Sequence, residues 1–312
     1  MRIAIVGAGA TGGYLGACLA RAGADVVLVA RGPHLAAMRE RGLTVREPDG
    51  SSFITRPQCT DDLAAAVGSA QVVFLTLKAH SLPGVAPELG AALRPGAIAV
   101  FAQNGIPWWY AEGLQCVDPG GLIAAHVPRE SVLGCVVYPA TSLLEPGVVE
   151  HVEGNRFSLG EPDGGRSERA AEIGKALISA GLKAPVSTRI RQEIWLKLLG
   201  NATFNPVSAL TRATLGQIGA APQGRDLIRA LMEEVDSVAT AESVAIDIGI
   251  ERRMEAGFAV GEHKTSMLQD LEAGRPLEID ALVGAVCELG DRHRLPLPHL
   301  RTVYGLAILL KH

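Results

Sequence analysis

The chain of 312 residues has few aromatic side chains and no concentration of one charge. Aromatic residues make up 4% of it, hydrophobic residues 48%, and the formal net charge is -4. No run is rich in Lys and Arg, which excludes the usual electrostatic basis for a nucleic-acid or anionic-membrane partner. No apolar run approaches the roughly 20 residues that a transmembrane helix requires. The composition therefore favours a small molecule as partner.

Cysteine and histidine are present, but not in a metal-binding pattern. The five cysteines are scattered without a Cys-x-x-Cys pair, and the eight histidines form no His-x-x-x-His pair. These spacings indicate neither a metal site nor a disulfide framework, and an odd number of cysteines fits reduced thiols. The chain opens on a strand-like Met-Arg-Ile-Ala-Ile-Val rather than on a cleavable signal segment. We therefore expect a cytoplasmic protein.

Two kinds of pattern divide the chain. Short runs rich in β-branched residues alternate with helical stretches at first, which is typical of a parallel sheet covered on both faces. From about residue 188 only helical patterns follow. We predict an α/β fold class with a parallel-sheet domain at residues 1–187 and an all-α domain at residues 188–312.

The individual elements are predicted from the same periodicities. Residues 147–160 are predicted to form a β-hairpin with its turn at Gly154-Asn155. The predicted strands cover residues 2–6, 25–29, 43–47, 71–77, 97–102 and 132–140. The predicted helices of the second domain cover residues 189–210, 221–245, 250–273, 278–293 and 299–311.

The motif Gly7-Ala8-Gly9-Ala10-Thr11-Gly12 follows the first predicted strand and opens a helix. That is the context which a dinucleotide-binding fingerprint requires. The first glycine permits a tight turn, the second lets the backbone approach a pyrophosphate, and the third allows close packing of helix and strand. Free amides and the helix dipole favour the phosphates. The motif predicts a Rossmann-type domain that binds a dinucleotide.

Residues after three other strands bear on which dinucleotide binds. The second strand ends Val29-Ala30-Arg31, without the acidic residue that commonly holds the ribose of NAD. Arg31 can form a bidentate contact with a 2′-phosphate, which favours NADP, and an exposed loop arginine is the alternative. Lys78 either reaches the same phosphate or is solvated. Asn104 either contacts the nicotinamide ribose or only forms the turn that Asn-Gly often forms.

Lys197, Asn201 and Asn205 are spaced four residues apart, which places them along one side of a helix. Such a stripe is on the order of 12 Å long and offers a small molecule one proton donor and two amides. The alternative is a solvated surface pair between Glu193 and Lys197. Pro206 argues against it, because a proline disturbs the helix at this point, as is more typical of a site than of a structural helix.

Together these motifs resemble the ketopantoate reductase (2-dehydropantoate 2-reductase) family. The elements that carry the resemblance are the glycine turn with Arg31, Leu77-Lys78-Ala79, Asn104-Gly105, Lys197-x-x-x-Asn201-x-x-x-Asn205-Pro206, and Ser266-Met-Leu-Gln-Asp with Glu278-Ile-Asp280. Alone, Ser266 would be an ordinary helix-surface residue, and Glu278 would be explained by the helix dipole. The resemblance extends from residue 1 to about residue 300.

The resemblance implies an oxidoreductase of pantothenate biosynthesis that reduces the 2-oxo acid ketopantoate to pantoate with NADPH. It implies catalytic roles for Lys197, as proton donor, and for Glu278. The substrate-binding residues that it implies are Asn104, Asn201, Asn205 and Ser266. The NADP(H)-binding residues that it implies are Gly7, Ala8, Gly9, Ala10, Thr11, Gly12, Arg31, Lys78, Asn104, Ala140 and Glu278.

Two other functions stay open on the sequence. One is an NADP-dependent reductase of a different 2-oxo or 3-hydroxy acid on the same scaffold, and the other is a non-catalytic NADP-binding sensor. The segment Pro107-Trp108-Trp109-Tyr110 bears on the substrate, because its rings either reshape the mouth of the cleft or cap the core of the first domain. The apolar helix at 303–310 either packs internally, which we favour, or forms a homodimer interface.

Overall fold

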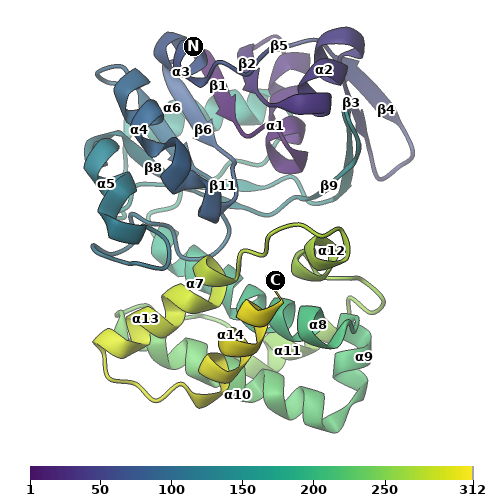
Figure 1. Ribbon diagram of the computed structural model, residues 1–312, viewed down its shortest axis with the longest axis vertical. Helices are drawn as coiled ribbons and strands as arrows, with labels where there is room; N and C mark the ends of the chain where they lie inside the picture. Colours follow the sequence, from purple (N-terminus) through teal and green to yellow (C-terminus); the bar gives the residue numbers. More distant parts are fainter. Residues whose placement is uncertain (311–312) are drawn as a thin grey trace. The chain divides into compact units, whose positions relative to one another are not determined.

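The structure is a computed structural model that describes residues 1–310, in which the chain divides into two units (Figure 1). Unit 1 comprises Met1–Gln103 and Leu122–Ile190, and unit 2 comprises Asn104–Gly121 and the chain from Arg191 onward. The sequence prediction assigned residues 104–121 to the first domain, and this part of it is wrong. These residues pack against helices of unit 2 through contacts with residues distant in sequence, which no local sequence pattern predicts.

A seven-stranded sheet forms the centre of unit 1 (Figure 1). Its order is β11-β8-β7-β6-β1-β2-β5, and all neighbours are parallel except β11 and β8. The strands are β1 (Arg2–Val6), β2 (Asp25–Val29), β5 (Gln58–Thr60), β6 (Val72–Leu75), β7 (Ile98–Phe101), β8 (Val132–Val137) and β11 (Phe157–Gly160). β1, β2 and β6 are almost wholly buried, as expected of a parallel sheet covered on both faces, so the predicted fold class is confirmed.

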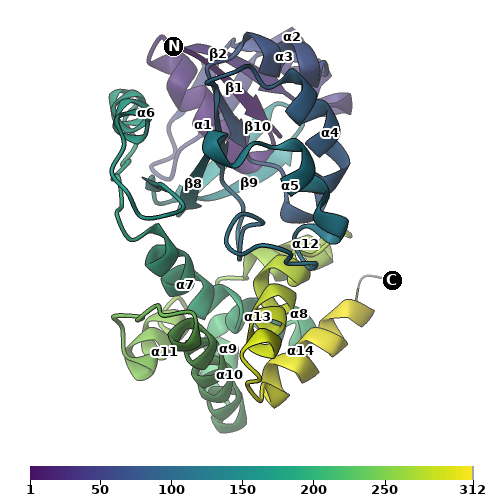
Figure 2. The same ribbon diagram turned by 90° about the vertical axis from the view of Figure 1, so that its left-hand side faces the viewer.

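Helices cover both faces of this sheet. On one face, α4 (Leu82–Ala92) packs against both α3 (Leu63–Ser69) and α5 (Leu122–His126), as Figure 2 shows. On the other face, α1 (Ala10–Arg21) packs against α6 (Glu168–Ser179). The helix α2 (Gly32–Arg41) follows β2 and packs against β5. The buried side chains between α1, α6 and the sheet include Ile5, Leu15, Phe74 and Leu159.

A second sheet of four strands packs against α1. Its order is β4-β3-β10-β9, with bounds Ser52–Thr55, Leu43–Arg46, Val148–Glu153 and Ala140–Glu145. The predicted hairpin at 147–160 is wrong, because β10 pairs with β9, whereas β11 returns to the main sheet and pairs with β8. The tight turn lies at Pro146-Gly147 instead, where Gly147 has a φ of +84°. A local turn signal cannot tell which sheet the next strand joins.

From Arg191 to residue 310, unit 2 is helical, as predicted. The helix α10 (Pro222–Ala241) buries one side, with Ile228, Leu231, Met232, Val235 and Val238 at the spacing of an amphipathic helix. It packs against α9 (Leu215–Ala220), α11 (Ile250–Phe258), α13 (Ala285–Arg292) and α14 (Pro298–Leu309). The other helices are α7 (Ile190–Asn201), α8 (Phe204–Thr211) and α12 (Ser266–Glu272), and α8 packs against α12.

Besides the prediction at 189–210, which divides into α7 and α8, two predicted helices of unit 2 are interrupted or irregular. The prediction at 250–273 divides into α11 and α12, because Gly261 has a φ of +70° and Thr265 caps a new helix. The prediction at 278–293 begins with a π-helical turn, η4 (Asp280–Gly284), and continues as α13. Such turns occur frequently at functional sites.

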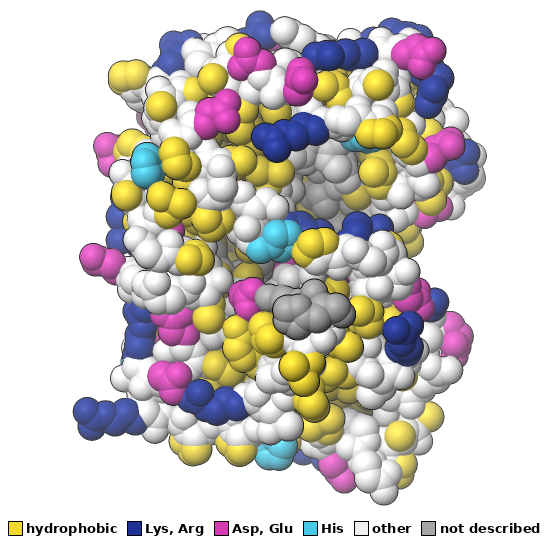
Figure 3. All heavy atoms as spheres, viewed as in Figure 1, with side chains coloured by type: hydrophobic (Ala, Val, Ile, Leu, Met, Phe, Trp, Pro, Cys, Tyr) yellow, Lys and Arg dark blue, Asp and Glu magenta, His cyan; other side chains and the backbone are white. Residues whose placement is uncertain are grey.

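The face shown in Figure 3 carries side chains of both charges. On the face shown in Figure 3, basic and acidic side chains are interspersed over both units, in keeping with the formal net charge of -4. Of the helices within residues 1–310, none combines the length and the apolar character needed to cross a membrane.

Candidate active site

The glycine turn between β1 and α1 is held by close backbone contacts. Gly7 has a φ of +95°, and its amide donates to the carbonyl of Val29 at 3.2 Å. A Cβ on Gly12 would lie 2.5 Å from the Gly7 carbonyl oxygen, so both positions require glycine. Gly9 is exposed, with no described atom within 4 Å of where its Cβ would be. Its backbone is therefore open to the approach of a phosphate.

The predicted cofactor residues of unit 1 follow strands that end level with one another. Val6 lies opposite both Val29 and Leu75 in the strand register. The glycine turn begins directly after β1, Arg31 lies two residues after β2, and Lys78 lies three residues after β6. Since β2 and β6 flank β1 on opposite sides, this edge is a topological switch point. Open α/β sheets bind their ligands at such a point.

Arg31, Lys78 and Ala140 differ in their surroundings. Arg31 is exposed and occupies the N-cap position of α2. Lys78 is half-buried and precedes the short 3₁₀ turn η1 (Ala79–Ser81). Ala140 begins β9, and the hydroxyl of the next residue, Thr141, lies 3.3 Å from the hydroxyl of Thr11. The second sheet therefore brings Ala140 close to the glycine turn, and the roles of all three residues stay predictions.

In unit 2 the predicted proton donor is hydrogen-bonded to another predicted residue. The Lys197 ammonium donates to Oδ1 of Asn104 at 2.6 Å, across 93 positions of sequence. Both side chains are half-buried. A charge-assisted bond of this length holds the ammonium in a defined direction. The sequence prediction assigned Asn104 to substrate and cofactor and did not include this contact.

Asn104 is itself positioned by the residues that follow it. Gly105 has a φ of +89°, and a Cβ on it would lie 2.3 Å from the carbonyl oxygen of Ala281. The amide of Ile106 donates to the same carbonyl at 2.9 Å. Ala281 belongs to the π-helical turn η4. Only glycine permits this close approach, which places Asn104 beside the turn.

The rest of the segment 104–121 is anchored to α13. The carboxylate of Glu288 accepts the amides of Gln115 and Cys116 at 2.8 and 2.9 Å. One turn later on α13, Arg292 donates to the carbonyl of Glu112 at 2.9 Å. Sequence reasoning missed Glu288, because its partner Gln115 is 173 positions away and no local pattern connects them.

The aromatic residues at 108–110 belong to unit 2. Trp108, Trp109 and Tyr110 are 4%, 2% and 1% exposed. From α7, the indole of Trp195 donates to the Tyr110 hydroxyl at 2.7 Å, and Arg191 donates to the Tyr110 carbonyl at 2.9 Å. The alternative in which these rings cap the core of the first domain is therefore wrong.

The predicted polar stripe is divided between two helices. The helix α7 ends at Asn201, and α8 begins three residues later. Pro206 has no N–H to donate to the carbonyl of Ala202, and its ring crowds that carbonyl. Lys197 and Asn201 therefore lie on α7 and Asn205 on α8, so one continuous helical stripe is wrong. Asn201 is half-buried and Asn205 is 6% exposed.

Ser266 and Glu278 lie at the beginnings of helical segments. Ser266 is the exposed first residue of α12, and the N-cap Thr265 accepts the amide of Leu268 at 3.3 Å. This helix packs against α8, which carries Asn205. Glu278 is half-buried and precedes η4. Contacts of Ser266, Asn201 and Asn205 with substrate, and the role of Glu278, stay predictions.

The thiol of Cys116, within segment 104–121, is not suited to nucleophilic chemistry. Burial raises the pKa of Cys116 to about 12, and the charges of Glu288 and Asp280 add to the rise. A thiol that stays protonated at neutral pH is inert. All five cysteines are free, and residues 1–310 contain no group of three His, Cys, Asp or Glu side chains that could hold a metal ion.

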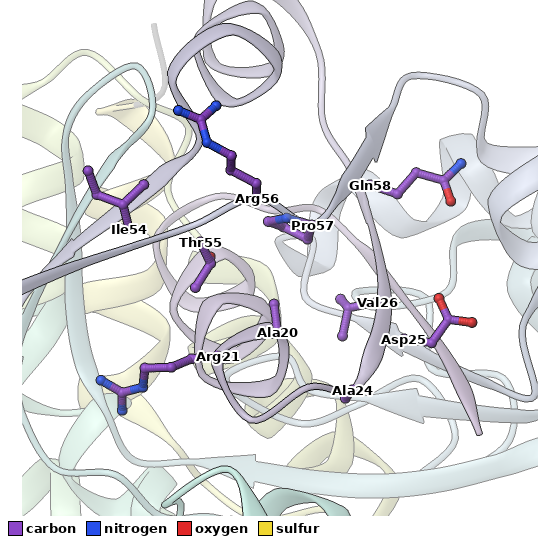
Figure 4. A pocket seen from close by; sticks show the side chains of 10 residues that line it. All are labelled: Ala20, Arg21, Ala24, Asp25, Val26, Ile54, Thr55, Arg56, Pro57 and Gln58. Atoms are coloured by element: carbon purple, nitrogen blue, oxygen red, sulfur yellow. The ribbon is translucent and has the colours of Figure 1, made fainter.

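A pocket of about 520 Å³ lies at the other end of β2, around Arg21, Asp25, Arg56 and Gln58 (Figure 4). The Arg21 guanidinium lies 3.8 Å from the centre of the Phe53 ring, and Arg56 donates to the Glu40 carbonyl at 3.2 Å. In Figure 4 these two guanidinium groups point in different directions. None of the predicted site residues lines this pocket, which adjoins the start of β2 rather than the carboxyl ends of the strands.

Comparisons with known proteins cover both units. The family model "Ketopantoate reductase PanE/ApbA" matches residues 3–164, and the model of its C-terminal part matches residues 189–311. A 2-dehydropantoate 2-reductase of Mesorhizobium japonicum is 47% identical, over 98% of this chain and 96% of the relative. One of Halobacterium salinarum is 30% identical, over 99% and 98%. The crystal structure of a PanE/ApbA family ketopantoate reductase from Ralstonia eutropha superposes with a TM-score of 0.88 at 28% identity, covering 100% of this chain and 98% of that one.

Proposed function

Because this chain belongs to the ketopantoate reductase family, we propose that it reduces the 2-oxo group of 2-dehydropantoate to the alcohol of pantoate, with NADPH as reductant. The proposal places the enzyme in pantothenate biosynthesis. One observation within the molecule carries it: the 2.6 Å bond from Lys197 to Asn104, which directs an ammonium group in the helical unit.

The residues of unit 1 fit NADPH. The open backbone at Gly9 and the start of α1 suit a pyrophosphate. Arg31 is an exposed guanidinium at the N-terminus of α2, and this combination suits the 2′-phosphate. Lys78 follows the strand on the other side of β1 and is assigned to the same cofactor. When bound, the dinucleotide supplies the hydride.

Lys197 supports the reaction at the substrate oxygen. As a new C–H bond forms at the ketone carbon, the electron pair of the C=O π bond moves to oxygen. An ammonium beside that oxygen stabilises the developing charge and donates the proton, and the resulting amine regains a proton from solvent. Asn104 accepts an N–H of Lys197, and this bond fixes the direction of the ammonium group.

The remaining substrate contacts are assigned to polar residues of the helical unit. Asn201 and Asn205 each carry an amide that both donates and accepts, and Ser266 adds a hydroxyl. These assignments rest on where the residues lie. Asn201 ends the helix that carries Lys197, and α12, which carries Ser266, packs against α8, which carries Asn205. Glu278, beside η4, is assigned to the junction of cofactor and substrate.

The test is the loss of NADPH absorbance with 2-dehydropantoate and with a panel of other 2-oxo acids of graded size. We expect kcat/KM to be highest for 2-dehydropantoate. A higher kcat/KM for another 2-oxo acid would assign the enzyme to that substrate instead. Tight binding of NADPH without turnover of any acid would identify a sensor.

Oligomeric state and compartment stay predictions. The helix α14 buries Leu300, Val303 and Ala307, in keeping with internal packing, and exposes Leu306 and Leu309 by 49% and 67%. Light scattering of the purified protein tests the homodimer. We expect the enzyme in the cytoplasm, where thiols stay reduced.

A further inference from the structure

His34 bonds to two separate parts of unit 1 through its two ring nitrogens. It lies in the first turn of α2, three residues after Arg31. Its Nε2 lies 2.7 Å from the carbonyl oxygen of Ala8, in the glycine turn. Its Nδ1 accepts the amide of Gly147, in the turn between β9 and β10, at 2.9 Å.

These partners define which nitrogen carries the proton. Because the Gly147 amide is a donor, Nδ1 must be unprotonated, so the proton lies on Nε2 and is donated to Ala8. Burial lowers the pKa of His34 more than its bond to Ala8 raises it, which favours this neutral ring. Both ring nitrogens are therefore satisfied in one tautomer only.

His34 bonds to the Ala8 carbonyl, whose oxygen must point away from an anion bound at this turn. A turn that binds phosphate presents its amides to the ligand, and a carbonyl oxygen facing the same ligand would repel it. In this turn the carbonyl of Gly7 accepts the hydroxyl of Thr76 at 2.8 Å. The next carbonyl, that of Ala8, accepts His34. Two side chains thus hold two successive carbonyls.

We propose that His34 is a positioning residue of the dinucleotide site, which keeps the Ala8 carbonyl turned from the pyrophosphate and couples the glycine turn to α2. This inference rests on the proposed binding of NADPH. The pyrophosphate is common to NADPH and NADH, so His34 acts on both cofactors alike. Arg31, in contrast, distinguishes them through the 2′-phosphate.

Three substitutions test the proposal. His34→Leu removes both bonds, His34→Gln places an amide nitrogen near the position of Nε2, and His34→Asn places an amide oxygen near that of Nδ1. Loss of one such bond corresponds to about a fivefold loss of affinity. We expect His34→Leu and His34→Asn to raise the Kd of NADPH and of NADH by about fivefold each, with kcat at saturating cofactor little changed. His34→Gln should bind both cofactors nearly as the wild type does.

The measurements are cofactor titrations by fluorescence, steady-state kcat and the melting temperature of the cofactor-free protein. Unchanged Kd values in His34→Leu would overturn the proposal. Normal cofactor Kd values in His34→Asn together with raised Kd values in His34→Gln would also overturn it, because Gly147 would then be the important partner. The Gln and Asn variants decide the matter even where the Leu variant does not fold. A wild-type protein that binds neither cofactor would contradict the proposed function itself.

Discussion

The Lys197 ammonium nitrogen lies 2.6 Å from Oδ1 of Asn104, although the two residues are 93 positions apart. The contact joins the helix α7 to the segment 104–121, which leaves the sheet unit and packs in the helical one. A proton donor must be aimed as well as present, because a catalytic proton transfer depends on geometry first. In the proposed mechanism, the bond to Asn104 fixes the direction of the Lys197 ammonium from within a single unit.

Removal of the Lys197 amine should abolish most turnover without disturbing the cofactor. We expect Lys197→Ala to lower kcat by at least about 100-fold, because the developing charge loses both its stabilisation and its proton. The Kd of NADPH should stay near that of the wild type. Lys175→Ala, on the exposed side of α6, is the matched control. Near-normal turnover of Lys197→Ala would remove this residue from the mechanism.

Substitution of Asn104 separates its contact with Lys197 from a role in cofactor binding. Asn104→Leu keeps the size of the side chain and removes the acceptor. A hydrogen bond to a charged group contributes about 1.5–3 kcal/mol, which corresponds to roughly 10- to 100-fold in kcat/KM. We expect this loss with the Kd of NADPH unchanged. A weaker Kd with normal kcat would instead favour the contact with the nicotinamide ribose.

Gly105 should tolerate no side chain. In Gly105→Ala the new Cβ would meet the Ala281 carbonyl oxygen at 2.3 Å, in addition to the cost of a φ of +89°. Gly113→Ala is the matched control, since Gly113 has a φ of +71° but its nearest atom would lie 4.0 Å away. We expect Gly105→Ala to be less stable than the control by about 1–3 kcal/mol and to lose turnover. Equal melting temperatures for Gly105→Ala and Gly113→Ala would contradict this expectation, because they would show that η4 shifts to accommodate the new Cβ.

Arg31 should determine the preference between the two nicotinamide dinucleotides. We expect Arg31→Ala to raise the Kd of NADPH by roughly 10- to 100-fold, the effect of losing a charged hydrogen bond, and to change the Kd of NADH little. Arg46→Ala, an exposed arginine of β3, controls for the change in net charge. Similar losses for both cofactors would contradict a contact with the 2′-phosphate.

An ion pair in unit 1 should make part of the stability depend on pH. Glu161 is 8% exposed and accepts Nε and Nη2 of Arg169 at 2.7 and 2.5 Å. Burial acts to raise the pKa of Glu161, but hydrogen bonds from Arg169 and Ser167 outweigh it and hold the pKa below its usual value. The stabilisation is therefore complete above the usual pKa of about 4.3 and is lost as the pH falls through the lowered value.

The corresponding variant is Glu161→Gln, with Glu172→Gln on the exposed side of α6 as control. We expect Glu161→Gln to lower the free energy of unfolding at neutral pH by about 1–3 kcal/mol, because charged hydrogen bonds become neutral ones. Its deficit should shrink in acid. Denaturant unfolding at several pH values measures both effects, and a deficit independent of pH would contradict the argument.

Local patterns predicted much of the first unit. Each strand of the main sheet that was predicted is present, and the glycine turn lies between β1 and α1 as expected, because hydrophobic period and glycine placement act over a few residues. The predicted hairpin at 147–160 is wrong because the pairing of its second strand depends on contacts distant in sequence. Phe157 and Leu159 are fully buried in the main sheet beside β8, and only the packed sheet decides that partner.

The order of residues along the chain was enough to determine a glycine turn at Gly7–Gly12 and helices after residue 188, and to predict Lys197 as proton donor, since each depends on neighbours in sequence. Only the tertiary structure decided that Asn104 belongs with Lys197, that a π-helical turn receives Gly105, and that His34 holds the Ala8 carbonyl. These contacts join residues distant in sequence, and their geometry follows from packing that no local propensity encodes.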